Sequence, residues 1–249
     1  MVDILSTEPL RGIFLKGEGD MLRERLQLLY LQSFILIGCL KVCLPQLIEG
    51  KESTPWKVEH PKKTSAEIIA ELEKQKIIPE IIKQAPSDVS VCEVVYNDTV
   101  INFGNIINYT FIKEHEPTHI KWPYKESKLY TLILTSPDTP GIEGHDKREL
   151  ILWLVGNIPE NNIDNGTSIV DYVPTFPYYE EGLHRYIYFV YEQRDAKQID
   201  FSDEIFIPSH IVSQRRCYFH TEEFKDKYKL GPLVAVNFCN MQFIRKFLI

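Results

Sequence analysis

Short apolar or alternating stretches recur along this 249-residue chain from residue 89 to residue 238. Alternation with a period of two is typical of half-buried strands, and a short continuous apolar run is typical of a strand buried on both faces. Asn, Asp, Pro and Gly bound these stretches, as they do at turns. The pattern predicts a mainly β fold with peripheral helices, with strands at 89–96, 100–103, 129–135, 150–156, 185–191 and 233–238.

Helices are expected around the strands. Thr64-Ser-Ala-Glu67 is a capping-box sequence, in which the Thr64 and Glu67 side chains accept hydrogen bonds from free backbone amides at a helix start. A shorter helical turn is expected at 80–83, opened by Pro79. A further helix is expected at 221–229.

Residues 1–63 are predicted to be an extension of the domain at 64–249. Within it, residues 23–43 are rich in Leu and contain no Pro, which predicts a helix. Its apolar residues cover more than one face, and such a helix is normally buried, here against the main domain or against a partner. Residues 51–63 are polar and contain two prolines, which indicates a linker.

The formal net charge is −7. It argues against a protein that binds nucleic acid over its whole surface, because that affinity comes mainly from neutralising phosphates. Residues 213–249 are richer in Lys and Arg than in Asp and Glu. They are the one segment from which we expect a basic patch, and the alternative is an ordinary solvated surface.

The five cysteines are an odd number spread over a long chain, which argues against a disulfide framework and favours a reducing compartment. Cys39 and Cys43 are one helical turn apart, but neither a His nor a second Cys pair lies close to them. Because a zinc site needs four ligands, no metal site is expected.

The apolar run at 28–44 contains Gln32 and Lys41, so we interpret it as a docking helix and do not expect a membrane span. Asp3 and Glu8 argue against a cleavable signal peptide and a conventional transit peptide.

Polar residues follow several of the expected strands. The strand at 129–135 runs into Pro137-Asp138-Thr-Pro140, and it must stop pairing there because proline donates no backbone hydrogen bond. Asp138 is then presented at the end of a strand, where ligands commonly bind. The alternative is a tight turn in which Asp138 caps its own backbone.

Several ordered motifs resemble the phosphatidylethanolamine-binding protein (PEBP) family over roughly residues 64–240. The motifs are Ser136-Pro-Asp138-Thr-Pro140, Arg148-Glu-Leu-Ile-Leu152, Asp171-Tyr-Val-Pro-Thr-Phe176-Pro-Tyr178 and Gly182-Leu-His184-Arg185-Tyr186. The resemblance implies a large antiparallel sheet, a smaller sheet packed against it, a few outer helices and a small pocket for phosphate-like headgroups. It also implies cis peptide bonds, which we expect at Thr139–Pro140 and leave open at Arg148–Glu149.

This chain departs from the family at the pocket. The residues that remain are Asp138, His184, Tyr186 and Arg148. The substituted positions are Ser136, Leu152, Phe176 and Tyr178. An anion site needs several converging donors and usually close approach of the backbone. Here Leu replaces a donor His and Phe replaces a Gly, so we expect a pocket that has lost its ligand, with Asp138 and Arg185 forming a structural ion pair beside it.

No nucleophile motif and no Gly-rich phosphate loop are present, so the sequence predicts neither an enzyme nor a cofactor. No small-molecule ligand is expected either.

The substituted pocket, the N-terminal arm and the segment Ile199-Asp-Phe-Ser202 resemble the branch of the family found in the mitochondrial large ribosomal subunit. That resemblance implies a structural, non-catalytic role near the central protuberance of the subunit, in the mitochondrial matrix. Other mitochondrial ribosomal proteins would contact the arm. Ribosomal RNA would be contacted by the basic residues Arg215, Arg216, Lys225, Lys227, Lys229, Arg245 and Lys246. The alternative is a soluble cytoplasmic PEBP that binds an anionic phospholipid headgroup or a phosphorylated partner and regulates signalling.

Overall fold

The structure of the protein is a computed structural model that describes residues 59–108, 116–138, 148–174, 182–211 and 214–243, all within one compact unit spanning 58–249. The helix expected at 23–43, its predicted burial against the main domain or a partner, and the Thr139–Pro140 peptide bond lie outside the described residues.

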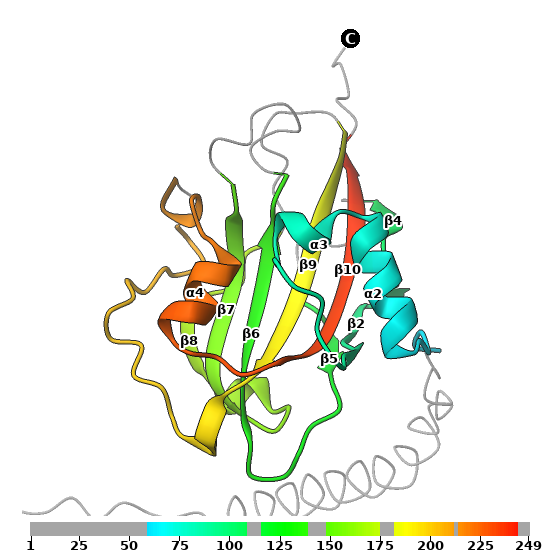
Figure 1. Ribbon diagram of the computed structural model, residues 1–249. Coiled ribbons are helices and arrows are strands. Elements are labelled where there is room, and N and C mark those ends of the chain that lie inside the picture. Colours follow the sequence, from blue (N-terminus) through cyan, green and yellow to red (C-terminus); the bar gives the residue numbers. More distant parts are fainter. Residues whose placement is uncertain (1–58, 109–115, 139–147, 175–181, 212–213, 244–249) are drawn as a thin grey trace, which may run out of the picture. The chain divides into compact units, whose positions relative to one another are not determined.

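Two β-sheets and three α-helices make up the described domain (Figure 1). The large sheet contains β1 (Ser90–Val91), β4 (Asn105–Asn108), β6 (Leu129–Ser136), β7 (Leu150–Pro159), β8 (Thr167–Val170), β9 (Gly182–Glu192) and β10 (Leu233–Phe243). The small sheet contains β2 (Glu93–Tyr96), β3 (Thr99–Val100) and β5 (His119–Lys121). The helices are α2 (Ser65–Lys74), α3 (Ile77–Glu80) and α4 (Thr221–Lys227), and 3₁₀ turns lie at Ile163–Asn165, Arg194–Ala196 and Gln214–Arg216.

The large sheet has the strand order β1-β10-β9-β6-β7-β8, with β4 also paired to β10. The long central strands are antiparallel, with Leu134 opposite Tyr188 and also opposite Trp153. Both β1 and β4 run parallel to β10, along its free edge. The large sheet is therefore antiparallel along its long strands, as predicted, and the parallel strands β1 and β4 make it mixed.

The two faces of the large sheet are covered differently. Because side chains alternate along a strand, Leu132 and Leu134 of β6 pack toward the small sheet, while Ile133 between them packs toward the helices. The small sheet contributes Val94 and Ile120 to the first of these layers, and α4 contributes Phe224 to the second. Figure 1 shows the helices lying along one face of the large sheet.

The start of α2 agrees with the sequence prediction, whereas the position of α3 does not. The capping box is present, with the Glu67 amide donating to Thr64 Oγ1 over 3.3 Å and the Thr64 amide donating to a Glu67 carboxylate oxygen over 2.7 Å. The short turn expected at 80–83 instead spans Ile77–Glu80, because the Ile81 amide closes it by donating to the Ile77 carbonyl.

The single strand expected at 89–96 is two strands. Residues Ser90–Val91 pair with β10 of the large sheet, whereas Glu93–Tyr96 pair with β5 of the small sheet. The Cys92 amide still donates to the Val236 carbonyl, so the chain leaves the large sheet at this residue. The short strands β4, β5 and β8 were not predicted.

Within the described ranges, no helix is long and apolar enough to cross a membrane.

Candidate functional site

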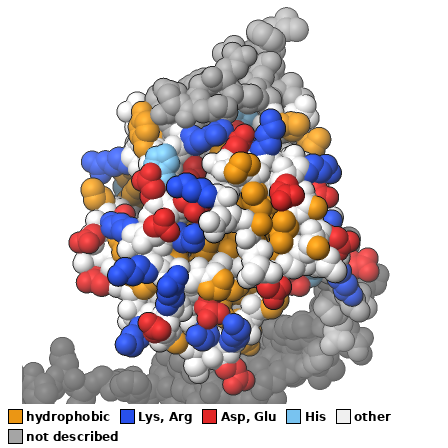
Figure 2. Space-filling model, in the orientation of Figure 1, with side chains coloured by type: hydrophobic (Ala, Val, Ile, Leu, Met, Phe, Trp, Pro, Cys, Tyr) orange, Lys and Arg blue, Asp and Glu red, His pale blue; other side chains and the backbone are white. Residues whose placement is uncertain are grey.

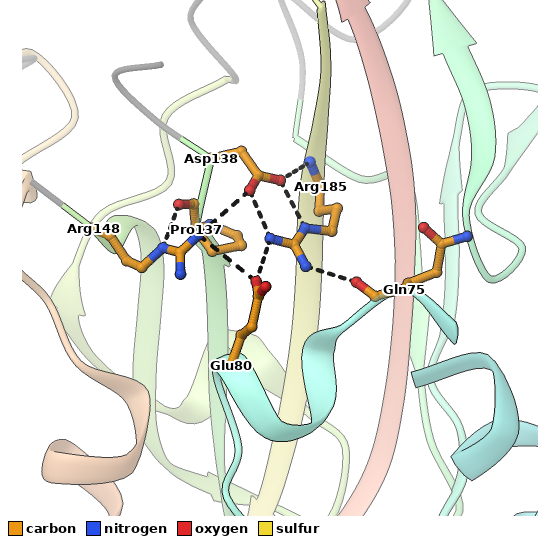
Figure 3. Close-up of polar contacts among 6 residues, drawn as sticks. All are labelled: Gln75, Glu80, Pro137, Asp138, Arg148 and Arg185. Atoms are coloured by element: carbon orange, nitrogen blue, oxygen red, sulfur yellow. Dashed lines mark hydrogen bonds and ion pairs between the residues drawn. The ribbon is translucent and has the colours of Figure 1, made fainter. Parts of the chain in front are cut away.

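The candidate site lies where β6 ends and β9 begins, and its centre is an ion pair between Asp138 and Arg185 (Figure 3). The Arg185 guanidinium donates from Nε to Asp138 Oδ2 over 2.8 Å and from Nη2 to Oδ1 over 2.7 Å. The Arg185 backbone amide donates to the same carboxylate over 2.9 Å. The structural ion pair expected between these two residues is therefore confirmed.

Two helical segments supply further partners for Arg185. Its Nη1 donates to the Gln75 carbonyl at the end of α2 over 2.6 Å, and its Nη2 also donates to Glu80 of α3 over 3.0 Å. All but one of the N–H groups of the Arg185 guanidinium thus donate to partners within the chain. Little of the Arg185 donor capacity is left for an external anion.

Arg148 reaches the same cluster from the start of β7. Its Nε donates to the Pro137 carbonyl over 3.0 Å, and its Nη2 lies 3.7 Å from Glu80 and 4.0 Å from Asp138 (Figure 3). Two guanidinium groups therefore face two carboxylates. The cluster is close to neutral, so it lacks the excess positive charge that attracts a phosphate.

Electrostatics in this cluster favour the charged forms. Burial alone would raise the pKa of Asp138, but the hydrogen bonds and the charge of Arg185 outweigh it and hold that pKa below its usual value. Burial lowers the pKa of Arg185, and Asp138 together with Glu80 more than offsets this effect, so the pKa is raised.

The other retained pocket residues lie on the opposite face of β9. His184 and Tyr186 are buried, and Tyr186 belongs to the core layer that faces the small sheet. Successive residues of a strand point to opposite faces, so His184 and Arg185 do not converge on one ligand from the same side. His184 is still near enough to Asp138 to help lower the pKa of that carboxyl.

Two of the substituted positions are described. Leu152 is fully buried in the core layer that also contains Leu134 and Tyr186, and Ser136 at the end of β6 is buried too. A leucine side chain in this layer contributes packing and no hydrogen-bond donor. The other two substituted positions, Phe176 and Tyr178, lie outside the described residues.

A second buried carboxylate connects the site to α4. Glu149 accepts hydrogen bonds from the Thr221 amide and hydroxyl, both over 2.7 Å. Burial raises the pKa of Glu149, and the hydrogen bonds from Thr221 partly oppose that shift. The peptide bond between Arg148 and Glu149 is cis, as is the one between Ile78 and Pro79.

The residues predicted to contact RNA do not all lie on the surface. Arg216 is buried and donates to the backbone carbonyls of Ile211, Leu152, Asp171 and Pro208. The prediction for Arg216 is wrong, because its guanidinium holds loops together inside the protein.

The other basic residues differ in their exposure and pairing. Arg215, Lys227 and Lys229 are exposed, and Lys225 is partly buried. Lys225 pairs with Glu222, and Lys227 pairs with Glu204. On the face shown in Figure 2, basic and acidic side chains are interspersed. Arg245 and Lys246 lie outside the described residues.

A groove of about 560 Å³ lies away from the ion-pair cluster, beside β8. Asn157, Ser168, Asp200, Phe201, Glu204 and Phe206 are among its lining residues. Sequence reasoning had singled out the segment containing Asp200 and Phe201, although not as the wall of a groove.

Sequence reasoning missed the partners that the helical segments provide. Glu80 lies 105 residues from Arg185 in the chain, and Gln75 lies 110 residues away. A helical turn containing Glu80 was predicted, but nothing in the sequence indicated that it would meet Arg185.

The two packed sheets, with the Asp138–Arg185 ion pair at the ends of paired strands, define a mainly β protein with a few outer helices. The family model described as phosphatidylethanolamine-binding protein matches residues 97–219. The phosphatidylethanolamine-binding protein from Plasmodium vivax has the same fold, with a TM-score of 0.59 at 20% identity over 74% of this chain and 99% of that one. Residues 97–219 of the chain therefore match the PEBP family model, and the described domain has a PEBP-like fold.

Two curated relatives extend the comparison. The 26 kDa secreted antigen of Toxocara canis is 30% identical over 166 residues, which are 67% of this chain and 61% of that protein. The chain thus spans about three fifths of the length of that relative. The putative odorant-binding protein A5 of Drosophila melanogaster is 28% identical over 172 residues, which are 67% of this chain and 76% of that protein.

Proposed function

We propose that this protein is a non-catalytic PEBP-family member that acts by binding a macromolecular partner and does not hold a small anion in its ancestral pocket. One observation carries the proposal: the charged residues retained at the site are neutralised by one another. Arg185 is occupied by Asp138, Glu80 and the Gln75 carbonyl. Leu152 also adds a buried apolar side chain where the family motif has a histidine.

The direct test is a titration of the full chain with phosphoethanolamine, in which binding is measured by isothermal calorimetry and by NMR. We expect no saturable heat and no shift of the His184 imidazole resonances. The Plasmodium vivax relative serves as the positive control for the assay. Binding with a Kd tighter than about 1 mM, or about −4 kcal/mol, would show that the pocket works.

We further propose that the partner is the mitochondrial large ribosomal subunit. The resemblance of the pocket substitutions and the N-terminal arm to that branch of the family supports this assignment. Exposed Arg215 and Lys229 at the C-terminal side of the domain are suited to phosphate contacts with ribosomal RNA.

The test of this assignment is sedimentation of the endogenous protein from mitochondrial lysate through a sucrose gradient. We expect it to migrate with the large subunit and to enter lighter fractions after the salt concentration is raised, since phosphate contacts weaken with salt. A charge-reversed Arg215→Glu, Lys229→Glu variant should dissociate at lower salt than a matched Lys76→Glu, Lys83→Glu variant with exposed lysines elsewhere. Sedimentation entirely as a free protein would exclude the ribosomal assignment.

The second candidate function is that of a soluble PEBP that binds a phosphorylated partner outside mitochondria. The names of the two curated relatives, a secreted antigen and an odorant-binding protein, favour a free-standing protein. Localisation of the tagged full chain separates the two candidates. A purely cytoplasmic signal with no ribosomal sedimentation supports the second one.

A further inference from the structure

Two histidines and a glutamate from three separate parts of the chain meet on the small sheet. Glu93 lies on β2 and His119 on β5, where Glu93 is opposite Lys121 and His119 is opposite Val95. Glu93 and His119 are therefore diagonal neighbours on one face of an antiparallel pair, within reach of long side chains. His60 joins them from the segment that precedes α2.

The three side chains face one another with their ligand-bearing atoms. Nε2 of His119 lies 3.4 Å from Glu93 Oε2, and Nε2 of His60 lies 3.6 Å from the same oxygen. One ligand atom from each of the three residues lies within 4.8 Å of those of the other two. A tetrahedral zinc ion with bonds of about 2.0–2.2 Å holds neighbouring ligand atoms about 3.4 Å apart. The two distances to Glu93 Oε2 are close to that value.

The neighbouring lysine does not compete with the two imidazoles for the Glu93 carboxylate. Lys121 is directly opposite Glu93, yet its amine donates to the Asn161 carbonyl over 3.2 Å and is also 3.4 Å from the Asn161 side-chain oxygen. The Nδ1 atom of His60 is buried and has no hydrogen-bond partner among the described residues, so Nε2 is its available polar atom.

The cluster is also accessible. The exposed fractions of the side chains are 22% for His60 and 39% for both Glu93 and His119. An ion can enter from solvent, and a position remains for water or an additional ligand. The segment with His60 is held to the domain by a second contact, since the Lys63 amine lies 5.5 Å from the centre of the Phe103 ring.

We propose that His60, Glu93 and His119 form a binding site for a divalent transition metal of the zinc class. Imidazole nitrogens with one carboxylate oxygen suit zinc, copper, nickel or cobalt, whereas magnesium and calcium require oxygen ligands. Three protein ligands leave at least one coordination position open to water. The metal would join the segment preceding α2 to the small sheet and so fix the point at which the N-terminal residues leave the domain.

The separation of the three residues along the chain explains why their spacing gave no sign of a metal site. They lie in a segment before the first helix of the domain and on two strands that are not consecutive, and metal motifs read from sequence depend on short fixed spacings.

The first experiment is calorimetric titration of the metal-free full chain with Zn²⁺ at pH 7.5, with and without His119→Asn or Glu93→Gln. We expect one saturable site in the wild-type chain. Loss of either ligand should weaken it by about 100-fold or more, because even supporting residues of metal sites typically change affinity about 10–100-fold. The matched control is His210→Asn, which removes an exposed histidine and should leave the titration unchanged.

The second experiment separates this site from thiol ligands and from misfolding. Co²⁺ added to the full chain should give visible d–d bands without a strong thiolate charge-transfer band, and the Nε2 resonances of two histidines should broaden or shift. Far-UV circular dichroism should be the same for both ligand variants and the control.

Two results would overturn the proposal. One is the absence of any saturable Zn²⁺ binding, which would leave only a carboxylate–imidazole contact. The other is binding that persists with unchanged affinity in His119→Asn and Glu93→Gln, because the ligands would then lie elsewhere in the chain.

Discussion

Asp138 receives three hydrogen bonds from a single residue, two from the Arg185 guanidinium and one from the Arg185 backbone amide. Both residues lie at strand ends where the family motifs place a ligand pocket. A bidentate pair of this kind is among the stronger hydrogen-bonded arrangements in proteins, and it orients both side chains. The pair therefore serves the structure of this edge of the sheet, consistent with the proposed loss of an anion ligand.

Replacing Asp138 by Asn should destabilise the protein substantially. The variant leaves Arg185 in a largely buried position with only Glu80 as a charged partner. Removing one member of a buried ion pair typically costs about 3–5 kcal/mol, and the remaining contact to Glu80 places our expectation near about 3 kcal/mol. Urea unfolding measures the change. Exposed Asp203→Asn is the control and should shift stability by less than about 0.5 kcal/mol. An equally small effect of Asp138→Asn would show that the pair is not structural.

The same pair predicts a dependence of stability on pH. The pKa of Asp138 is lower in the folded chain than in the unfolded one, so its contribution is fully present above about pH 4 to 5 and is lost as the pH falls through the folded pKa. The difference in unfolding free energy between wild type and Asp138→Asn should therefore shrink as the pH is lowered from 7 toward 2. Glu149, whose raised pKa acts in the opposite direction, is common to both proteins and cancels in the comparison. A difference that stays constant over this range would contradict the assignment.

The long strands could be predicted from sequence because their apolar runs are long and their ends carry turn residues. The strands β6, β7, β9 and β10 are present where they were expected, although β7, β9 and β10 extend farther than predicted. The switch of the chain between sheets at Cys92 could not be predicted, because the pattern of apolar residues is the same whichever sheet a strand joins. The strands β5 and β8 are only three and four residues long, so they carry little periodic signal.

The site could be predicted from sequence only for the residues that belong to local motifs. The pairing of Asp138 with Arg185 followed from two motifs of the resemblance, whereas Glu80 and the Gln75 carbonyl enter through the docking of helices. Arg216 was misassigned because a basic segment suggests a basic surface. Its guanidinium instead satisfies buried carbonyls, which composition does not reveal.

Truncating Leu152 tests how much its buried side chain contributes to stability. The side chain is fully buried between the two sheets, so Leu152→Ala should cost about 2–5 kcal/mol through lost apolar burial and the cavity left behind. Ile205→Ala provides a matched control, because Ile205 is 75% exposed. Thermal and urea unfolding of both variants measure the difference. If the two variants lose the same stability, Leu152 does not fill the space between the sheets.

The last prediction concerns Asn237, which joins the two sheets. From β10 its side-chain amide donates to the Cys92 carbonyl over 2.8 Å and to the Ile101 carbonyl over 3.0 Å, and its oxygen accepts from the Phe103 amide over 3.0 Å. In Asn237→Asp, an ionised carboxylate of nearly the same shape accepts but cannot donate. The two carbonyls lose their partner and a charge is buried beside them.

We expect Asn237→Asp to destabilise the protein by about 2–4 kcal/mol at pH 7, since a buried unsatisfied polar group costs about 1–3 kcal/mol and a charged one more. Burial should raise the pKa of the new carboxyl, so the loss should grow as the pH rises above about 4 and be smaller in acid, where the protonated group can donate one hydrogen bond. The exposed Asn102→Asp variant is the control and should show neither the loss nor its pH dependence. Urea unfolding at pH 4.5 and pH 7 measures both effects. Equal stability of Asn237→Asp and wild type at pH 7 would mean that this amide does not connect the sheets.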